Sequence, residues 1–150
     1  METGKIIIRV YGIYNNPELG ILVSDEIVKG RRITKFPGGG LEYGEGPMDC
    51  LRREMIEETG SEFEILSHFY TTSFFVNSVF HADRQVVSIY YTMHPLKQIE
   101  FRIAKRVFDF EMEEEGAQSF RYILPETISE DSFSLVVDRA VGKMLSEKKF

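Results

Sequence analysis

A glycine-rich segment that runs directly into an acidic helix constrains this chain more than any other feature. Residues 37–46 contain five glycines behind Pro37. Glycine permits tight turns and lets a ligand approach the backbone closely. Residues 47–59 follow as the clearest helix, because Pro47 suits a first helical turn and Gly60 suits the position just past a last turn. The sequence therefore predicts a loop and then a helix across residues 37–60.

The other predicted elements are mostly strands. Runs of β-branched and aromatic residues predict strands at 5–14, 20–28, 31–36, 63–76, 84–94, 107–110 and 120–124. An acidic loop is expected at 111–116, and apolar residues at helical spacing predict a helix across 133–148. No repeat or linker interrupts the 150 residues, so we expect one domain spanning 1–150. This order of elements favours an α/β fold in which helices cover a mixed sheet.

Negative charge is concentrated in one short segment. The chain has a formal net charge of −6, which disfavours a general nucleic-acid binder because such proteins present a basic face. Residues 42–62 account for most of it, with two bases, Arg52 and Arg53, against seven acids. The acids are Glu42, Glu45, Asp49, Glu54, Glu57, Glu58 and Glu62. Such a local excess requires either solvation or a bound cation.

Helical geometry gathers three of these carboxylates on one side. At roughly 100° per residue, Glu54, Glu57 and Glu58 share an arc beside an apolar stripe of Met48, Leu51 and Met55. Like charges at this spacing repel, and the negative end of the helix dipole disfavours anions in the last turn. A hard divalent cation such as Mg²⁺ or Mn²⁺ would turn this repulsion into ligation. The alternative is a solvated acidic face, and the glycine-rich loop in front of the helix argues for the metal.

The spacing of these residues resembles the Nudix box. Gly39 is followed after five residues by Glu45 and after seven more by Arg53-Glu54-Met55; then come Glu57-Glu58 and, after one residue, Gly60. The agreement holds over 22 residues, and Phe36-Pro37-Gly38-Gly39 resembles the usual lead-in. One position departs from the pattern, since Ser61 stands where an aliphatic residue is usual.

The resemblance to the Nudix hydrolase family implies a fold and an activity. The fold would be the Nudix fold, an α/β/α sandwich with a mixed sheet, over nearly the whole chain. The activity would be Mg²⁺-dependent hydrolysis of a diphosphate linkage in a nucleoside-diphosphate-linked compound, with Mn²⁺ as the alternative ion. A catalytically idle module that senses nucleotides is the competing reading, and the intact glutamates argue against it.

The resemblance also implies roles for individual residues. Glu57 and Glu58 would be the principal metal ligands, and Glu54 would be a ligand or the general base. The backbone carbonyl of Gly39 would complete the coordination. The resemblance also places Arg53 in the catalytic set with Glu54 and Glu57. Arg53 would act together with Glu45 to orient these glutamates.

Three basic residues precede the glycine-rich loop. Arg31, Arg32 and Lys35 are candidates for contacts with substrate phosphate, and ordinary charge on a strand surface is the equally weighted alternative. Cys50 falls within the carboxylate arc and is expected to be a small packed residue, because no basic partner is nearby to activate it. The acidic loop offers Glu111, Glu113, Glu114 and Glu115 as alternative bases, although a solvated charge run is favoured for each.

The sequence narrows the cellular setting and leaves the substrate open. A single cysteine excludes an intrachain disulfide, which favours the cytoplasm. The first residues lack a signal-peptide layout, and no apolar run approaches membrane-spanning length. The expected partner is a small nucleoside-diphosphate compound, with no membrane. The acidic charge disfavours nucleic acid, and so also the alternative of an RNA-processing enzyme. A homodimer formed through an exposed strand or through residues 69–80 is left open. ADP-ribose, sugar nucleotides, dinucleoside polyphosphates and nucleoside triphosphates all remain candidate substrates.

Overall fold

The computed structural model describes residues 4–148 and divides into two compact units. The first unit comprises the chain up to Gly12 together with Gly38–Ile99, and the second comprises Ile13–Pro37 and the chain from Glu100 onward. The single-domain organisation expected from the sequence stays a prediction. Among the residues described, no helix is long and apolar enough to cross a membrane.

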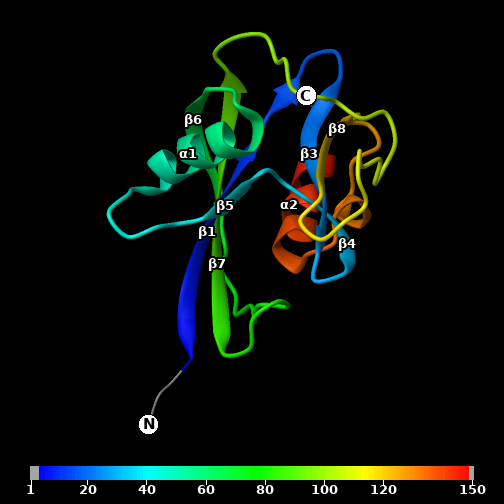
Figure 1. Cartoon of the computed structure of the whole chain (residues 1–150). Coiled ribbons are helices and arrows are strands. Elements are labelled where there is room, and N and C mark those ends of the chain that lie inside the picture. Colours follow the sequence, from blue (N-terminus) through cyan, green and yellow to red (C-terminus); the bar gives the residue numbers. More distant parts are fainter. Residues whose placement is uncertain (1–3, 149–150) are drawn as a thin grey trace. The chain divides into compact units, whose positions relative to one another are not determined.

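The first unit is a four-stranded sheet with a helix packed on it (Figure 1). The strand order is β5 (Gly38–Gly40), β1 (Lys5–Ile13), β7 (Arg84–Pro95) and β6 (Phe63–Thr71). Helix α1 (Pro47–Thr59) packs against β5 and β6. Strands β1 and β5 pair antiparallel, with Val10 opposite Gly39. Gly38–Gly40, which the sequence placed in a loop, therefore form an edge strand of this sheet, and the rest of the glycine-rich segment is the loop that leads into α1.

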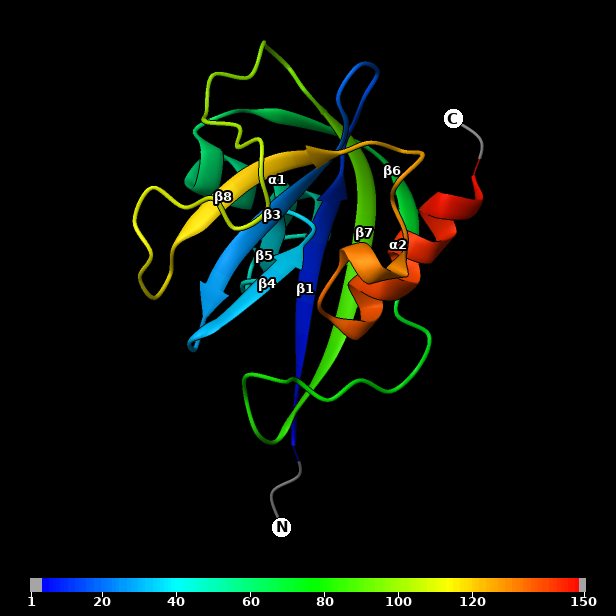
Figure 2. The same cartoon turned by 90° about the vertical axis from the view of Figure 1, so that its right-hand side faces the viewer.

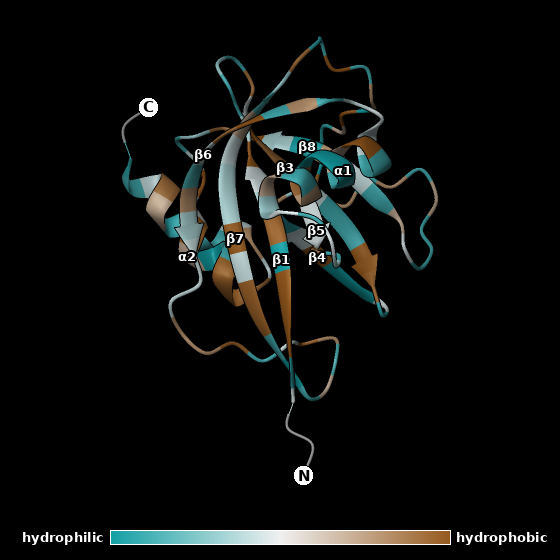
Figure 3. Ribbon diagram, turned by 90° about the vertical axis from the view of Figure 1, so that its left-hand side faces the viewer, coloured by the Kyte–Doolittle hydropathy of each residue, from teal (hydrophilic) through white to brown (hydrophobic). Residues whose placement is uncertain are grey.

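The buried face of α1 follows the apolar stripe expected from the sequence. Leu51 and Met55 are completely buried, and Cys50 is buried beside them. Met48 is only partly buried. Figure 3 shows α1 as mostly hydrophilic and the first part of β1 as hydrophobic. One face of α1 thus closes the core, and its carboxylates lie along the edge of that face.

The second unit contains the other sheet and the C-terminal helix. Strand β3 (Gly20–Val28) lies between β4 (Arg31–Lys35) and β8 (Gln118–Ile123), and the two-residue β2 (Asn15–Asn16) also pairs with β3 (Figure 2). A 3₁₀ turn, η1 (Glu130–Ser132), packs against helix α2 (Val136–Glu147). The expectation of an α/β fold with a mixed sheet is confirmed.

Most sequence-based boundaries are confirmed within a few residues. Helix 47–59 and strand 20–28 are correct at both ends. The strand expected at 63–76 ends at Thr71. The strand expected at 107–110 is wrong: Phe108 has a φ of 56°, which is incompatible with a strand. Its backbone N–H donates instead to Oδ2 of the buried Asp25 at 3.0 Å.

The C-terminal helix begins later than the apolar spacing predicts. The expected helix covered 133–148, whereas α2 begins at Val136. Ser129 caps the preceding 3₁₀ turn with its side chain, and Phe133 ends that turn in an extended conformation. The Phe133 ring stacks on Phe36 with ring centroids 4.3 Å apart. Tertiary packing therefore removes Phe133 from the helix that its apolar character suggested.

Candidate active site

Helix α1 is delimited by the two residues that predicted it. Pro47 occupies the first turn, after Gly46 in an extended conformation. Gly60 adopts the left-handed conformation with a φ of 74°, and its N–H donates to the Ile56 carbonyl at 2.8 Å. This capping is the usual role of glycine just past a helix. The ends of α1 fix the positions of its acidic residues relative to the loop.

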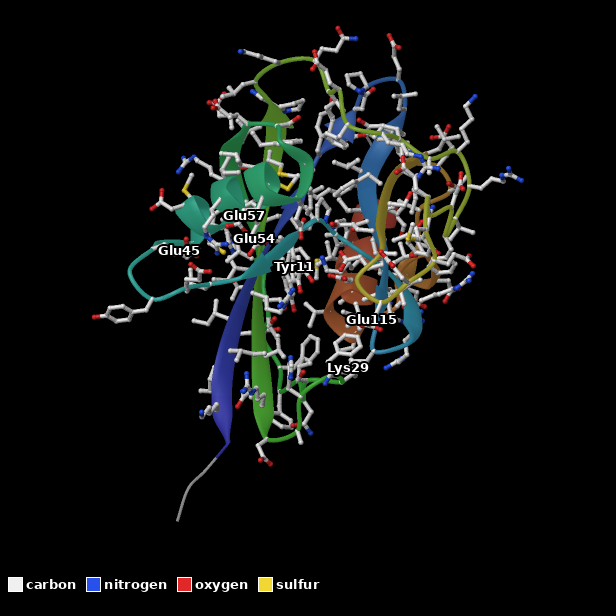
Figure 4. The ribbon with its side chains drawn as sticks, in the orientation of Figure 1. Tyr11, Lys29, Glu45, Glu54, Glu57 and Glu115 are labelled. Carbon is white, nitrogen blue, oxygen red and sulfur yellow. The ribbon has the colours of Figure 1, made fainter. Side chains whose placement is uncertain are left out.

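Arg53 is the centre of the candidate site. Its Nη1 atom donates to Oε1 of Glu54 at 3.0 Å and to Oε2 of Glu57 at 3.1 Å. Its Nη2 atom donates to the Gly40 carbonyl at 3.0 Å. Figure 4 shows Glu54 and Glu57 on α1, with Glu45 on the loop leading to it. A single guanidinium thus ties two of the predicted ligands to the glycine strand.

Glu45 holds this arginine in a two-pronged ion pair. Oε2 and Oε1 of Glu45 accept from Nε and Nη2 of Arg53 at 2.9 and 2.7 Å. Parallel bonds of this kind fix orientation as well as charge. The hydrogen bond from Arg53, followed by one from the Glu42 backbone N–H, lowers the pKa of Glu45 to about 2. The same ion pair raises the pKa of Arg53. Both side chains therefore stay charged at neutral pH.

Gly39 lies directly against the carboxylate of Glu54. A Cβ atom at residue 39 would stand 2.5 and 2.6 Å from the two carboxylate oxygens of Glu54, closer than real contacts allow. Any side chain at this position would therefore collide with Glu54. The absence of a side chain lets the backbone of β5 and the Glu54 carboxylate occupy neighbouring space.

The chemistry of the donors suits a hard divalent ion, although their arrangement is not a closed ligand set. Carboxylate oxygens are the preferred ligands of Mg²⁺. Oε2 of Glu58 is buried from solvent, on the same helix turn as Glu57. Within residues 4–148, no three acidic, histidine or cysteine side chains are grouped closely enough to hold a metal ion. In this structure Arg53 occupies the space between Glu54 and Glu57.

Cys50 is a packed residue, as expected, but the expectation that no basic group lies nearby is wrong, because Nη2 of Arg53 donates to its Sγ atom at 3.7 Å. The side chain is completely buried. Burial, and after it the charge of Glu45, raises the pKa of the thiol to about 12. A thiol that stays protonated is a poor nucleophile. Its Sγ atom lies 3.5 Å from the carbonyl oxygen of Gly40, so Cys50 helps to pack β5 against α1.

The basic residues considered for phosphate contacts all lie on β4, in the second unit. Arg31 is exposed. Arg32 is also exposed and pairs with Glu113 at 2.8 Å. Lys35 is buried and pairs with Glu26 at 3.1 Å. Their role in substrate binding stays a prediction.

The acidic loop is attached to its own unit by several of its carboxylates. Glu115 accepts from the backbone N–H groups of Lys29 and Gly30 at 2.6 and 2.9 Å, and Figure 4 shows Lys29 and Glu115 close together. Glu113 pairs with Arg32, and Glu111 lies 3.5 Å from Arg102. These contacts favour a structural role for the loop over a role as general base.

Sequence reasoning missed one cation beside the glycine strand. Arg9 lies opposite Gly40 in the pairing of β1 and β5. Its Nε atom donates to the Tyr11 hydroxyl at 2.6 Å, and its guanidinium lies over the Tyr11 ring. The alternation of β1 shows that Arg9 and Tyr11 share a face. Only the strand pairing places that face beside Gly40.

Comparison with known proteins agrees with this geometry. The sequence profile of the NUDIX domain matches residues 6–134. The structure resembles the MutT protein from Methanosarcina mazei Go1, with a TM-score of 0.68 and 14% identity, covering 97% of this chain and 95% of that chain. It also resembles a UDP-X diphosphatase, with a TM-score of 0.57 and 16% identity, covering 98% of this chain and 62% of that chain. An ADP-ribose pyrophosphatase from Streptococcus suis 89-1591 matches with a TM-score of 0.50 and 14% identity, covering 96% of this chain and 94% of that chain.

These structural similarities, all below 20% identity, establish the fold. The profile covers well over half of the chain and includes the whole segment from Gly39 to Ser61. Enzymes of the Nudix family generally use a divalent metal ion. This chain belongs to the Nudix family, and it is an enzyme of the pyrophosphohydrolase type.

Proposed function

We propose that the protein hydrolyses a diphosphate linkage in a nucleoside-diphosphate-linked compound, with Mg²⁺ as its metal ion and Mn²⁺ as a substitute. The observation that supports the proposal is the hydrogen bonding of Arg53, whose Nη1 atom donates to the carboxylates of both Glu54 and Glu57. Glu45 fixes that arginine from the loop side. This arrangement keeps several carboxylates together at neutral pH. On a solvated acidic surface, the carboxylates would instead be expected to lie apart in water.

Glu57 and Glu58 are the proposed principal ligands of the ion, with Glu54 as a ligand or as the general base. The backbone of Gly39 adds a carbonyl from the glycine strand. When bound, the ion would neutralise diphosphate charge and polarise the phosphorus. Arg53 and Glu45 act through the glutamates, because their hydrogen bonds fix where the Glu54 and Glu57 carboxylates lie.

The chemical step is attack of water on one phosphorus of the diphosphate. A carboxylate oxygen accepts a proton from that water, a bond forms between the water oxygen and phosphorus, and the bridging P–O bond breaks. The leaving phosphate ester takes the electron pair of the broken bond. Glu54 suits the role of base by position, since its side chain is only 15% exposed and its carboxylate lies against Gly39.

Several finer points belong to the same proposal. The substrate is a small molecule, and the protein acts in the cytoplasm. The candidates for contacts with the substrate phosphates are Arg31, Arg32 and Lys35. Solved structures with the same fold include proteins named as a UDP-X diphosphatase and an ADP-ribose pyrophosphatase. Those names support a test panel that contains sugar nucleotides and ADP-ribose, together with dinucleoside polyphosphates and nucleoside triphosphates.

The test is turnover of this panel with Mg²⁺ present, followed by chromatography of the products. The Glu57→Gln/Glu58→Gln double variant and a chelator-treated sample run in parallel. We expect hydrolysis by the wild type that both treatments abolish. Hydrolysis in ¹⁸O-labelled water should place the label on a phosphate product. Tight binding of one compound without any turnover would support the sensing module instead.

A further inference from the structure

The first part of β1 is an open edge of the sheet in the first unit. Strand β5 pairs with β1 only at residues 9–11. Next to this pairing, the Leu41 N–H donates to the Ile8 carbonyl at 2.9 Å. Among residues 4–148, no strand pairs with β1 on this side before Ile8. In Figure 1 the blue start of β1 has β7 on one side and no strand on the other.

Ile6 presents its backbone to this open edge. Successive residues of a strand direct their hydrogen-bonding groups to alternate sides. The Lys5 N–H donates to the Asp83 carbonyl at 2.8 Å on the side of β7, whereas the Ile8 carbonyl accepts from the side of β5. The N–H and C=O groups of Ile6 therefore point away from β7. Its side chain is 65% exposed, and edge groups of this kind can pair with another chain.

The opposite edge of the same sheet is protected against such pairing. Strand β6 has two register shifts in its pairing with β7, one between Ile65 and Ser67 and another after His68. Bulges of this kind keep an edge strand from accepting another chain. Residues 5–8 read Lys-Ile-Ile-Ile, without proline or acid, and Figure 3 shows this part of β1 as hydrophobic. A bare apolar edge promotes aggregation unless a strand covers it.

We propose that a second copy of this chain covers the open edge, through antiparallel pairing of the two β1 strands about a two-fold axis at Ile6. Each Ile6 N–H donates to the carbonyl of the partner's Ile6, and Lys5 lies opposite the partner's Ile7. Cross-strand neighbours then share a face of one continuous sheet. Both open edges are used at once, so the assembly closes at two chains.

Charge complementarity favours a second copy as the occupant. In this register β1 continues the line of the partner's β5, which ends at Gly40. Lys5 therefore lies beside the point where the partner's Glu42 leaves that line. The Glu42 side chain is 67% exposed, so two symmetric ion pairs form. Strand β1 contains no acid, and two chains of net charge −6 thus meet where their repulsion is small.

The open edge also argues against a lipid surface at this end of the first unit. Backbone N–H and C=O groups without partners are costly in hydrocarbon, so a free strand edge is not inserted into a membrane. A second strand satisfies the same groups. The proposal goes beyond diphosphate hydrolysis, because the pairing requires neither a metal ion nor a substrate.

The test is sedimentation velocity of the full chain between about 1 and 100 µM, without divalent ions or nucleotide. We expect the wild type to pass from monomer to dimer within this range. A chain that stays monomeric at about 100 µM, or that forms larger assemblies without a dimer, would overturn the proposal.

Two lysine variants locate the interface. Ile6→Lys places like charges opposite each other at the two-fold axis, so the dissociation constant should rise at least about tenfold. Leu66→Lys is the matched control, because Leu66 is 47% exposed on the other edge strand, β6. It should dimerise like the wild type, and circular dichroism shows whether both variants are folded. Equal dissociation constants for the two variants would overturn the assignment to β1.

A second pair of variants tests the contact between Lys5 and the partner's Glu42. Lys5→Glu places two acids together and should weaken the dimer at least about threefold. Lys97→Glu changes the net charge by the same amount at an exposed lysine of the same unit, and it should leave the dimer unchanged. Equal weakening by both variants would show general repulsion and overturn the register.

Hydrogen exchange gives a readout that needs no variant. The Ile6 amide points to solvent in a single chain and donates to the partner in the dimer, so its exchange should slow at least about tenfold between 1 and 100 µM. The Lys5 amide, which donates to Asp83 within the chain, should exchange equally at both concentrations. Exchange of Ile6 that does not depend on concentration would overturn the proposal. Absence of hydrolysis would count against the proposed function alone and leave this inference standing.

Discussion

Replacement of Gly39 by alanine should separate activity from stability. The new Cβ would stand 2.5 Å from Oε1 of Glu54, whereas ordinary contacts begin at 3.4 Å, so the carboxylate must shift by about 0.9 Å. The obstructing atoms are the far end of a flexible side chain, so the backbone need not move. A misplacement of about 1 Å in a catalytic group costs about 100-fold in rate. We therefore expect kcat/KM to fall about 100-fold, equivalent to about 2.7 kcal/mol of transition-state stabilisation.

Gly40 provides the matched control. A Cβ at residue 40 has Arg9 Nη1, at 3.9 Å, as its nearest neighbour, which is ordinary contact. Gly40→Ala should therefore keep kcat/KM within about threefold of the wild type. Steady-state kinetics and thermal unfolding are measured on both variants, and the Tm of Gly39→Ala should fall by less than about 4 °C. The reasoning is refuted if Gly39→Ala retains full activity, or if both variants lose activity equally.

Three further predictions concern the surroundings of Arg53 and the end of α1. The pKa of Glu45 is lowered from 4.5 to about 2, so its stabilising contribution is complete above pH 4.5 and is lost as the pH falls toward 2. The free energy of unfolding of Glu45→Gln, measured with denaturant, should therefore change less with pH across this window than that of the wild type. An equal change in the two proteins would contradict the ion pair. Because burial raises the thiol pKa of Cys50 to about 12, a thiol reagent at pH 8 should label the protein only after unfolding; rapid labelling of the native protein would show that Cys50 is accessible. Gly60 has a φ of 74°, so Gly60→Ala should lower the free energy of unfolding by about 1 kcal/mol in urea titrations, and an unchanged midpoint would argue against the cap.

Local chemistry made much of the fold predictable. Pro47 and Gly60 delimit α1 because their preferences concern the backbone at the helix ends themselves. The same reasoning was wrong at 107–110, where apolar residues suggested a strand. There the hydrogen bond from Phe108 to Asp25 joins residues 83 positions apart, and it places Phe108 at positive φ. A contact of that range leaves no trace in the local pattern.

In the candidate site, too, some features were predictable from local sequence and others depended on tertiary structure. The spacing of the Nudix box singled out Arg53 and Glu54 as members of one site. That Arg53 also holds the Gly40 carbonyl required the loop geometry. The position of Arg9 required the register of β1 against β5. A cavity lined by Thr34, Phe108, Arg121 and Phe133 draws on four separate segments of the chain, so no local motif indicates it.

The most direct test of the account is Mn²⁺ binding measured by electron paramagnetic resonance. The wild type, the Glu57→Gln/Glu58→Gln variant and a Glu62→Gln control are titrated under the same conditions. Glu62 is an equally acidic neighbour that lies beyond the end of α1. The account predicts that the wild type and Glu62→Gln bind Mn²⁺ alike, and that the double variant binds at least about tenfold more weakly. Equal binding by the double variant would contradict the claim that the glutamates of α1 hold the metal ion.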